Sequence, residues 1–237
     1  MLHYLKNRIK TSQMFWRYRH FVDPFVWQSY YADYHNKRRS FYAEYMKKQK
    51  MRSVFEFGCA SGPNLRNILQ HFDNATAHGS LKEDEPVTKT EIPLVILGYD
   101  INRYAIKLAQ TQMHGNGRMF VDKLRKPEIV TFLSDHGIDH FDLAIYDRVL
   151  YLLEADEVEN HFAMFAAMLE KVVIDDFHNT AATRTNGAYA TKNYATILGN
   201  HGFELHADEP SEHIANEPFF KKYARRLTFK KNGNRIH

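Results

Sequence analysis

The sequence predicts an α/β protein with a mainly parallel sheet of seven strands and helices on both faces. Two observations lead to this prediction. From residue 53 onward, apolar runs of strand length alternate with amphipathic stretches, which is typical of parallel sheets with right-handed crossovers. The last two apolar runs have no clear helix between them, which predicts a closing antiparallel hairpin and an edge strand.

The elements can be assigned in order along the chain. Apolar runs predict strands at residues 53–58, 93–100, 118–122, 141–147, 171–177, 202–208 and 225–231. Helical periodicity predicts helices at 62–72, at 102–114, within 154–170 and around 187–200. Residues 73–92 are polar and aperiodic, so we expect an exposed insertion loop there.

The first 52 residues differ in composition from the rest of the chain. They contain 12 Lys and Arg but 3 Asp and Glu, a net charge of +9, whereas the remainder contains 20 and 25, a net charge of −5. They also hold both tryptophans and 13 of the 33 aromatic residues. We therefore expect a helical, basic and aromatic lid at 1–52 and a binding domain at 53–237. Such a lid could contact nucleic acid, or could simply pack across the domain with its Lys and Arg stems over apolar surface.

Composition argues against several classes of protein. No apolar run approaches the roughly 20 residues that span a membrane, and the N-terminal residues lack the apolar core of a secretory signal. The single cysteine, Cys59, cannot form an internal disulfide. We therefore expect a cytoplasmic protein with no membrane partner.

The segment SVFEFGCASGPNLRN (53–67) joins the first strand of the binding domain to its first helix. Gly58 permits a tight turn, and Gly62 permits the close approach of a ligand or a helix. Pro63 suits the first turn of a helix, and Asn64 could cap that helix or contact a ligand. Ligands of open α/β sheets bind at the carboxyl ends of the strands, so this turn is a candidate binding loop.

Acidic residues end the next two strands. Asp100 ends the second strand, where a carboxylate commonly binds the two hydroxyls of a ribose. Asp122 ends the third strand, where it could accept a hydrogen bond from an adenine amino group. With the glycine turn, these acids predict a nucleoside-binding site. The turn lacks G-x-G-x-x-G and the chain lacks G-x-x-x-x-G-K-[ST], which argues against a nicotinamide dinucleotide and a nucleoside triphosphate.

At these positions the sequence resembles the class I S-adenosylmethionine-dependent methyltransferases, over roughly residues 50–230. VFEFGCASGPNL resembles the first motif of that family, LGYDINRYAI the second, and FDLAIYDRVLYLL the segment around the fourth strand. One departure is Ala60, which stands where the family often has glycine. The resemblance implies a Rossmann-like methyltransferase fold, S-adenosylmethionine as cofactor and S-adenosylhomocysteine as product.

The resemblance also implies roles for individual residues. Glu56 would serve the ammonium end of the cofactor, Asp100 its ribose and Asp122 its adenine, and Tyr146 would border its methionine part. The complete set of implied cofactor-binding residues is Glu56, Gly58, Cys59, Ala60, Gly62, Asn64, Asp100, Ile101, Asp122 and Tyr146.

Residues after the fourth and fifth strands are candidates for catalysis. Asp147, Tyr151 and His178 could act as the general base for a hydroxyl acceptor. Arg148 could bind an anionic acceptor, although Asp147 and Arg148 could equally form a helix start and a surface salt bridge.

A magnesium site is an alternative that the sequence only weakly favours. Some O-methyltransferases of this fold hold Mg²⁺ with an acid after the fourth strand and a pair after the fifth, and Asp147 with Asp175 and Asp176 could imitate that set. The surrounding residues do not otherwise resemble those enzymes, so we expect no metal.

Residues 28–45 bring six aromatic and basic side chains close to the first strand in sequence: Tyr30, Tyr31, Tyr34, His35, Arg38 and Arg39. The rings could pack on a sugar and an arginine could pair with the cofactor carboxylate, although core packing explains most of them equally well. We therefore expect methylation of a small molecule, such as a sugar or glycan precursor. Two alternatives stay open. One is a nucleic-acid methyltransferase, despite the absence of D/N-P-P-Y, and the other is a non-catalytic cofactor-binding interaction protein.

Overall fold

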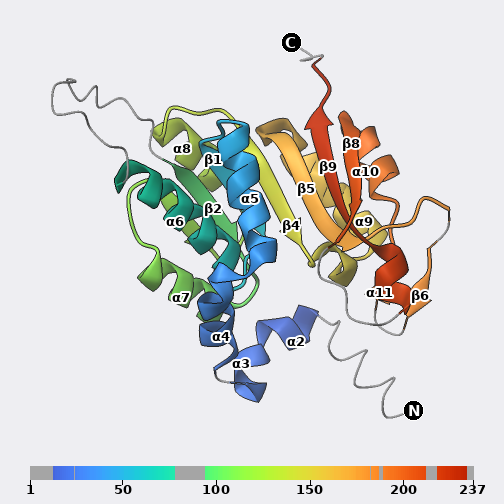
Figure 1. The fold of residues 1–237 in the computed structure, drawn as a ribbon, viewed down its shortest axis with the longest axis horizontal. Helices are drawn as coiled ribbons and strands as arrows, with labels where there is room; N and C mark the ends of the chain where they lie inside the picture. Colours follow the sequence, from blue (N-terminus) through green and yellow to red (C-terminus); the bar gives the residue numbers. More distant parts are fainter. Residues whose placement is uncertain are drawn as a thin grey trace.

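A computed structural model places a seven-stranded sheet at the centre of the molecule (Figure 1). The structure describes residues 13–23, 25–77, 94–181, 183–186, 189–211 and 218–233. The strands of the sheet are β1 (Ser53–Phe57), β2 (Val95–Tyr99), β3 (Arg118–Val121), β4 (Phe141–Asp147), β5 (Leu169–Phe177), β8 (Phe203–Pro210) and β9 (Ala224–Lys231). Their order is β3-β2-β1-β4-β5-β9-β8, and β6 (Thr185–Asn186) and β7 (Tyr189–Ala190) form a separate hairpin.

The sheet is mainly parallel, as the sequence predicts. Strands β1 to β5 pair in parallel, and β9 is antiparallel to both β5 and β8. The antiparallel pairing predicted for the last two strands is therefore confirmed, and β9 lies inside the sheet. The edge is β8, because β9 inserts between β5 and β8 after the short helix α11 (Pro218–Tyr223).

Helices cover both faces of the sheet (Figure 1). Helices α5 (Lys37–Lys48), α6 (Pro63–Ala77) and α7 (Arg103–Gln112) pack on one face around a core that includes Tyr42, Leu65, Ile106 and Leu143. Helices α8 (Lys126–Asp135), α9 (Ala155–Phe165) and α10 (Tyr194–Asn200) pack on the other face around Phe55, Leu133, Phe162 and Leu198. Burial of both faces explains why the strands read as continuous apolar runs.

Alternation along the strands decides which polar side chains reach the site. In β4, Leu143 and Ile145 belong to the core under α5 and α6, whereas Ala144 and Tyr146 belong to the opposite core. Since side chains alternate along a strand, Asp147 points to the α5 side. The same reasoning places Glu56 on that side, because its neighbours Phe55 and Phe57 lie in the opposite core.

The N-terminal helices lie at the carboxyl ends of the parallel strands, at the bottom of Figure 1. They are α2 (Gln13–Arg17), α3 (Arg19–Val22), α4 (Val26–Ala32) and the 3₁₀ turn η1 (Asp33–His35). Hydrogen bonds tie them to the binding domain: Ser61 Oγ donates to Trp27 O at 2.7 Å, and Asn102 Nδ2 donates to Trp16 O at 2.7 Å. The Arg66 guanidinium stacks on Tyr31 and Tyr34, at 4.1 and 3.7 Å from the ring centroids.

Two predicted elements need correction, and one helix was not predicted. Helix α6 continues to Ala77, so the first residues of the predicted 73–92 loop are helical, while 78–92 lie outside the described residues. The helix expected around 187–200 is the shorter α10, preceded by the β6–β7 hairpin. Helix α8 was not predicted, although Pro127 early in it and the apolar Ile129 and Leu133 are its signals. In the described part of the chain, no helix is long and apolar enough to cross a membrane.

Candidate functional site

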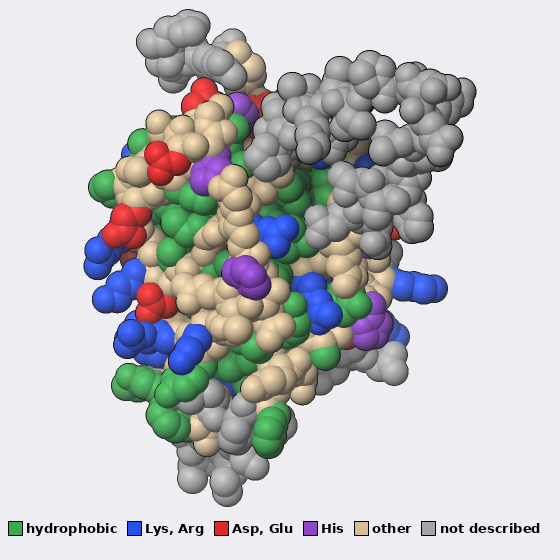
Figure 2. Space-filling view, turned by 90° about the vertical axis from the view of Figure 1, so that its left-hand side faces the viewer, with side chains coloured by type: hydrophobic (Ala, Val, Ile, Leu, Met, Phe, Trp, Pro, Cys, Tyr) green, Lys and Arg blue, Asp and Glu red, His purple; other side chains and the backbone are tan. Residues whose placement is uncertain are grey.

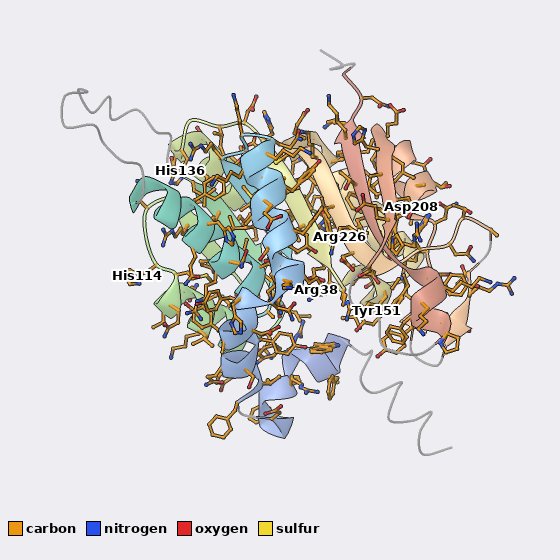
Figure 3. All side chains as sticks on the ribbon, in the orientation of Figure 1. Arg38, His114, His136, Tyr151, Asp208 and Arg226 are labelled. Atoms are coloured by element: carbon orange, nitrogen blue, oxygen red, sulfur yellow. The ribbon has the colours of Figure 1, made fainter. Side chains whose placement is uncertain are left out.

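A cavity of about 710 Å³ opens between the N-terminal helices and the carboxyl ends of β1, β2 and β4. Of the residues expected at the site, nine line it: Glu56, Gly58, Cys59, Ala60, Asn64, Asp100, Ile101, Asp147 and Tyr151. Figure 3 shows Arg38 and Tyr151, which come from α5 and from the turn after β4, at the same end of the sheet. A cavity of this size is typical of small-molecule sites.

The turn after β1 uses its backbone amides in hydrogen bonds within the protein. Gly58 has φ +76°, and a Cβ there would lie 2.4 Å from Val149 Cγ2, so only glycine fits. The amides of Gly58 and Cys59 both donate to Tyr99 O, at 2.7 and 2.8 Å, and the amide of Ala60 donates to Asp100 Oδ2 at 2.8 Å. These three N–H groups are therefore used within the protein. A phosphate-binding loop instead directs such groups at its ligand.

Asp100 lies at the tip of β2, and each of its carboxylate oxygens accepts a hydrogen bond from a backbone amide. Oδ2 accepts from Ala60 N and Oδ1 accepts from Asn102 N, each at 2.8 Å. Burial raises the pKa of Asp100 to about 6, although these two bonds work against the rise. Since a carboxylate offers about four acceptor positions, Asp100 can still accept from ligand hydroxyls on the cavity side.

A buried network joins β1, α6, β4 and α5. Asn64 Nδ2 donates to Glu56 Oε1 at 2.7 Å and to Asp147 Oδ2 at 2.9 Å. Arg39 Nη1 donates to Asn64 Oδ1 at 2.7 Å, and Arg38 Nη1 donates to Asp147 Oδ1 at 2.9 Å. Asn64 thus contacts two acids and an arginine, which fixes its orientation at the start of α6.

Glu56 is the acid of this network whose contacts are incomplete. Its side chain is buried, and among the described residues its Oε2 has no hydrogen-bond partner. Burial, followed by the negative charge of Asp147, raises the pKa of Glu56 to about 8. A buried carboxylate oxygen without a partner costs free energy, so a cationic or donor group entering the cavity would stabilise it.

Asp147 has the opposite electrostatic setting. Both of its oxygens accept hydrogen bonds, and its salt bridge to Arg38 is buried, with 6% and 11% of the two side chains exposed. Burial alone would raise the pKa of Asp147, but the charge of Arg38 and the bond from Asn64 outweigh it and hold the pKa below its ordinary value. Asp147 is therefore an ionised counter-ion.

Tyrosines and a second arginine complete the wall near β4. Tyr151 lies in the 3₁₀ turn η2 (Leu150–Leu152), its ring centroid 5.3 Å from that of Tyr189. Burial raises the pKa of Tyr151 well above its ordinary value. Arg148 takes a left-handed backbone conformation, with φ +55°, directly after β4. Tyr30 and Arg148 also line the cavity.

Four residues expected at the site do not line the cavity. Tyr146 is fully buried in the opposite core and its hydroxyl contacts His161 Nε2 at 2.8 Å, because alternation turns it away from the cavity. His178 is buried beside Lys192 O, at 3.1 Å from Nδ1. Asp122 pairs with Arg103 at 3.1 Å. Gly62, with φ +79°, packs against α7, where a Cβ would lie 2.2 Å from Met113 Cε.

Of the three acids of the possible magnesium set, Asp147 and Asp175 are partners in the register of β4 and β5, and Asp176 points away from them. Asp175 belongs to the α5 side, where it accepts from Ser211 Oγ at 2.6 Å and pairs with Arg226 at 3.2 Å. Asp176 points to the other face and accepts from Tyr151 N at 3.0 Å. Among the described residues, no group of three or more His, Cys, Asp or Glu could hold a metal ion.

The sequence analysis missed several residues of the cavity wall. Tyr189 lies in the β6–β7 hairpin, where a helix was expected. Phe15, Trp16 and Arg19 come from α2 and α3, and no motif links them to the site. Only the aromatic and basic excess of residues 1–52 indicated that this segment would contribute.

No protein-family model and no curated protein matches the chain, but solved structures do. The chain is similar to a 1,6-didemethyltoxoflavin N1-methyltransferase from Burkholderia thailandensis, solved with 1,6-didemethyltoxoflavin and S-adenosylhomocysteine (15% identity, TM-score 0.54, 90% of each chain). It is similar to the methyltransferase domain of bacterial CtHen1-C (12%, 0.56, 84% of this chain and 99% of that chain). It is also similar to the N-methyltransferase NodS from Bradyrhizobium japonicum WM9 (13%, 0.53, 83% and 98%). The chain therefore has the class I Rossmann-like fold of S-adenosylmethionine-dependent methyltransferases.

Proposed function

We propose that this chain is an S-adenosylmethionine-dependent methyltransferase that acts on a small molecule. The observation that carries the proposal is the pair of acids on neighbouring strand tips, the buried Glu56 and the half-buried Asp100, both lining one cavity. One acid has an oxygen without a partner among the described side chains, and the other sits where a ribose is expected.

The residues present fit this cofactor. Glu56 Oε2 would accept from the ammonium group, and Asp100 would accept from the ribose hydroxyls. Gly58 and Ala60 would allow the cofactor close to the backbone, and Ile101 would give an apolar contact beside the ribose. When bound, the cofactor supplies a methyl group on a sulfonium that already carries its leaving group. The protein has chiefly to bind, orient and exclude water.

The turn also favours a nucleoside without phosphates. The amides of Gly58, Cys59 and Ala60 are occupied by Tyr99 O and Asp100, so they offer nothing to a pyrophosphate. A dinucleotide or a nucleoside triphosphate needs those donors. This observation argues against a nicotinamide dinucleotide more strongly than the glycine spacing does.

A small acceptor is favoured over nucleic acid. Arg38 and Arg39 belong to the basic N-terminal segment but are directed inward, to Asp147 and Asn64, and Arg19 lines the cavity. The face seen in Figure 2 carries basic and acidic side chains interspersed, without a continuous basic band. Three of the twelve N-terminal Lys and Arg residues therefore serve the site and not an external polyanion.

Calorimetric titration of the full chain with S-adenosylmethionine, S-adenosylhomocysteine and NAD⁺ tests the proposal. We expect micromolar binding of the first two and none of the third. Asp100→Asn should weaken cofactor binding by about 10- to 100-fold, because a hydrogen bond to a charged group contributes about 1.5–3 kcal/mol. Asp122→Asn is the matched control, and its affinity should change by less than about threefold because Asp122 pairs with Arg103 outside the cavity.

Two outcomes would contradict the proposal. If neither S-adenosyl compound binds the wild-type chain, the non-catalytic interaction protein becomes the better account. If NAD⁺ binds and depends on Asp100, the chain is an oxidoreductase candidate.

A further inference from the structure

Resting on the proposed function, we infer that the acceptor is a flat aromatic or heteroaromatic acid that is methylated as its anion, with Arg38 and Arg148 holding its negative charge. Three observations carry this inference. The acids near β4 are all engaged with donors, two arginines line the same part of the wall, and tyrosine rings line the rest.

The acceptor end of the cavity offers no free base among the described side chains. Asp147 accepts from Arg38 and Asn64 and is held ionised by them. Asp33, which also lines the cavity, pairs with Arg39 Nη2 at 3.0 Å. No histidine in the described part of the chain lines the cavity.

Three further titratable groups of the cavity do not serve as a base for the acceptor either. Tyr151 lines that end, but its pKa is raised by burial, so it keeps its proton at neutral pH. Glu56 and Asp100 lie at the tips of β1 and β2, where the proposed cofactor binds. A hydroxyl of a sugar, the acceptor class expected from the sequence, would need a base that this wall does not supply.

Of the charged side chains that line this end of the cavity, two are positive and one is negative. Arg38 and Arg148 both line the cavity near Asp147, which is hydrogen-bonded to Arg38. Burial, and then the charge of Arg38, lower the pKa of Arg148, although the charges of Asp147, Asp175 and Asp176 work against this decrease. Arg148 is also set in place by a left-handed backbone conformation, with φ +55°, and its amide donates to Asp175 O at 2.9 Å. An anionic acceptor between the two arginines would gain charge-assisted hydrogen bonds, which planar guanidinium groups form well with carboxylates.

The rest of the wall suits a planar ring. Tyr30, Tyr151 and Tyr189 line the cavity beside Leu152 and Leu153. Tyr151 is in turn supported by Phe177, with ring centroids 5.5 Å apart. Aromatic and leucine side chains give a large apolar contact area to a flat ligand, and tyrosine rings stack on aromatic groups.

The chemistry balances without a base. A lone pair of the acceptor anion forms the bond to the methyl carbon, the carbon–sulfur bond breaks, and its electron pair stays on sulfur. The anion becomes a neutral methylated product and the sulfonium becomes a neutral thioether, so no proton has to leave. Opposite charges are neutralised in a water-poor cavity, where charge attraction is stronger than in bulk water.

The test uses the full chain loaded with S-adenosylhomocysteine. Binding of benzoate and 4-nitrophenolate is compared by calorimetry with binding of 4-nitrobenzyl alcohol, benzylamine and methyl glucoside. We expect the anions to bind at least about tenfold more tightly than the neutral alcohol. Arg148→Met should remove that difference and Arg148→Lys should keep part of it. Arg103→Met, at an exposed arginine outside the cavity, should leave it unchanged.

Turnover gives a second, independent readout. Formation of S-adenosylhomocysteine from S-adenosylmethionine is followed against pH for a series of nitro- and halophenols. The inference predicts that the midpoint of the rate profile moves with the pKa of each phenol. A midpoint that stays fixed across the series would reveal a base on the enzyme and would overturn the inference, as would a preference for methyl glucoside or benzylamine.

The failure of this inference can be told from the failure of the proposed function. If S-adenosylhomocysteine binds the wild type and the Arg148 variants equally but anions are not preferred, only the acceptor class is wrong. If S-adenosylhomocysteine does not bind the wild type, the methyltransferase function and this inference fall together.

Discussion

The cavity wall holds acids in opposite states, although two of them, Glu56 and Asp147, accept from the same Asn64 Nδ2. At the tips of β1 and β2, desolvation raises the pKa values of Glu56 and Asp100 to about 8 and about 6. At the tip of β4, Asp147 is buried as deeply, yet its pKa is lowered because Arg38 reaches it from α5. A strand-tip acid is thus left for a ligand or engaged as a counter-ion according to whether an N-terminal arginine contacts it.

The largest expected effect comes from removing the buried salt bridge between Arg38 and Asp147. Asp147→Asn leaves the Arg38 charge buried without its counter-ion, so the free energy of unfolding should fall by about 3–5 kcal/mol. Urea denaturation measures this change. The double variant Arg38→Met with Asp147→Asn should recover much of the loss, because it removes both charges. A loss below about 1 kcal/mol, which is typical of an exposed pair, would show that Asp147 is not a buried counter-ion of Arg38.

The next effect concerns the way in which Glu56 makes the free energy of unfolding depend on pH. The folded-state pKa of Glu56, about 8, lies above its ordinary value of 4.5, so the folded protein holds a proton that the unfolded chain has lost. The free energy of unfolding should therefore decrease as the pH rises from about 4.5 to about 8. Glu56→Gln lacks this titration. Relative to the wild type, it should gain roughly 2–4 kcal/mol between pH 4 and pH 8, measured by urea denaturation at each pH. Parallel pH profiles for the two proteins would contradict the buried, protonated acid.

A smaller effect separates packing from ligand contact at the glycine turn. Gly62→Ala places a Cβ against Met113 at a positive φ, so the free energy of unfolding should fall by about 1–3 kcal/mol. Affinity for S-adenosylhomocysteine should stay within about threefold of the wild type, because Gly62 does not line the cavity. Gly199→Ala in α10 is the control, since nothing lies within 4 Å of its added Cβ. A large loss of affinity in a stably folded Gly62→Ala variant would restore the ligand role expected from the sequence.

The smallest effect is at Ala60, which has φ +50° where the family often has glycine. A left-handed conformation costs a non-glycine residue about 1–2 kcal/mol, and the greater freedom of glycine in the unfolded chain offsets part of the gain. Ala60→Gly should therefore stabilise the protein by about 1 kcal/mol or less in thermal denaturation, with the affinity for S-adenosylhomocysteine unchanged. Destabilisation would show that the methyl group of Ala60 contributes packing that outweighs its backbone strain.

The sequence predicts the strands and most helices well, because their side chains repeat with the same period as the apolar residues of the sequence. Strand 141–147 coincides with β4, and 53–58 and 225–231 differ from β1 and β9 by one residue. The order of the last strands was not predictable in this way, since the pairing of β9 with β5 is set by tertiary contacts and not by any local pattern.

The residues of the site likewise fall into those that a local motif predicts and those that depend on tertiary contacts. Glu56, Gly58 and Asp100 could be singled out because a motif fixes them at a strand end. Tyr146 could not be excluded without knowing the phase of β4, since one residue separates the cavity from the opposite core. The Arg38–Asp147 pair spans 109 residues of sequence, and no local pattern predicts such a contact.

One measurement tests the central claim, that Glu56 is a protonated acid positioned to bind the ammonium group of the cofactor. Binding enthalpies of S-adenosylmethionine are measured at pH 7 in two buffers with different ionisation enthalpies, for the wild type and for Glu56→Gln. Because Glu56 has a pKa of about 8, it is protonated before binding, and the ammonium group should displace that proton. We predict the release of about one proton by the wild type and none by Glu56→Gln. Binding by the wild type without proton release would contradict the account.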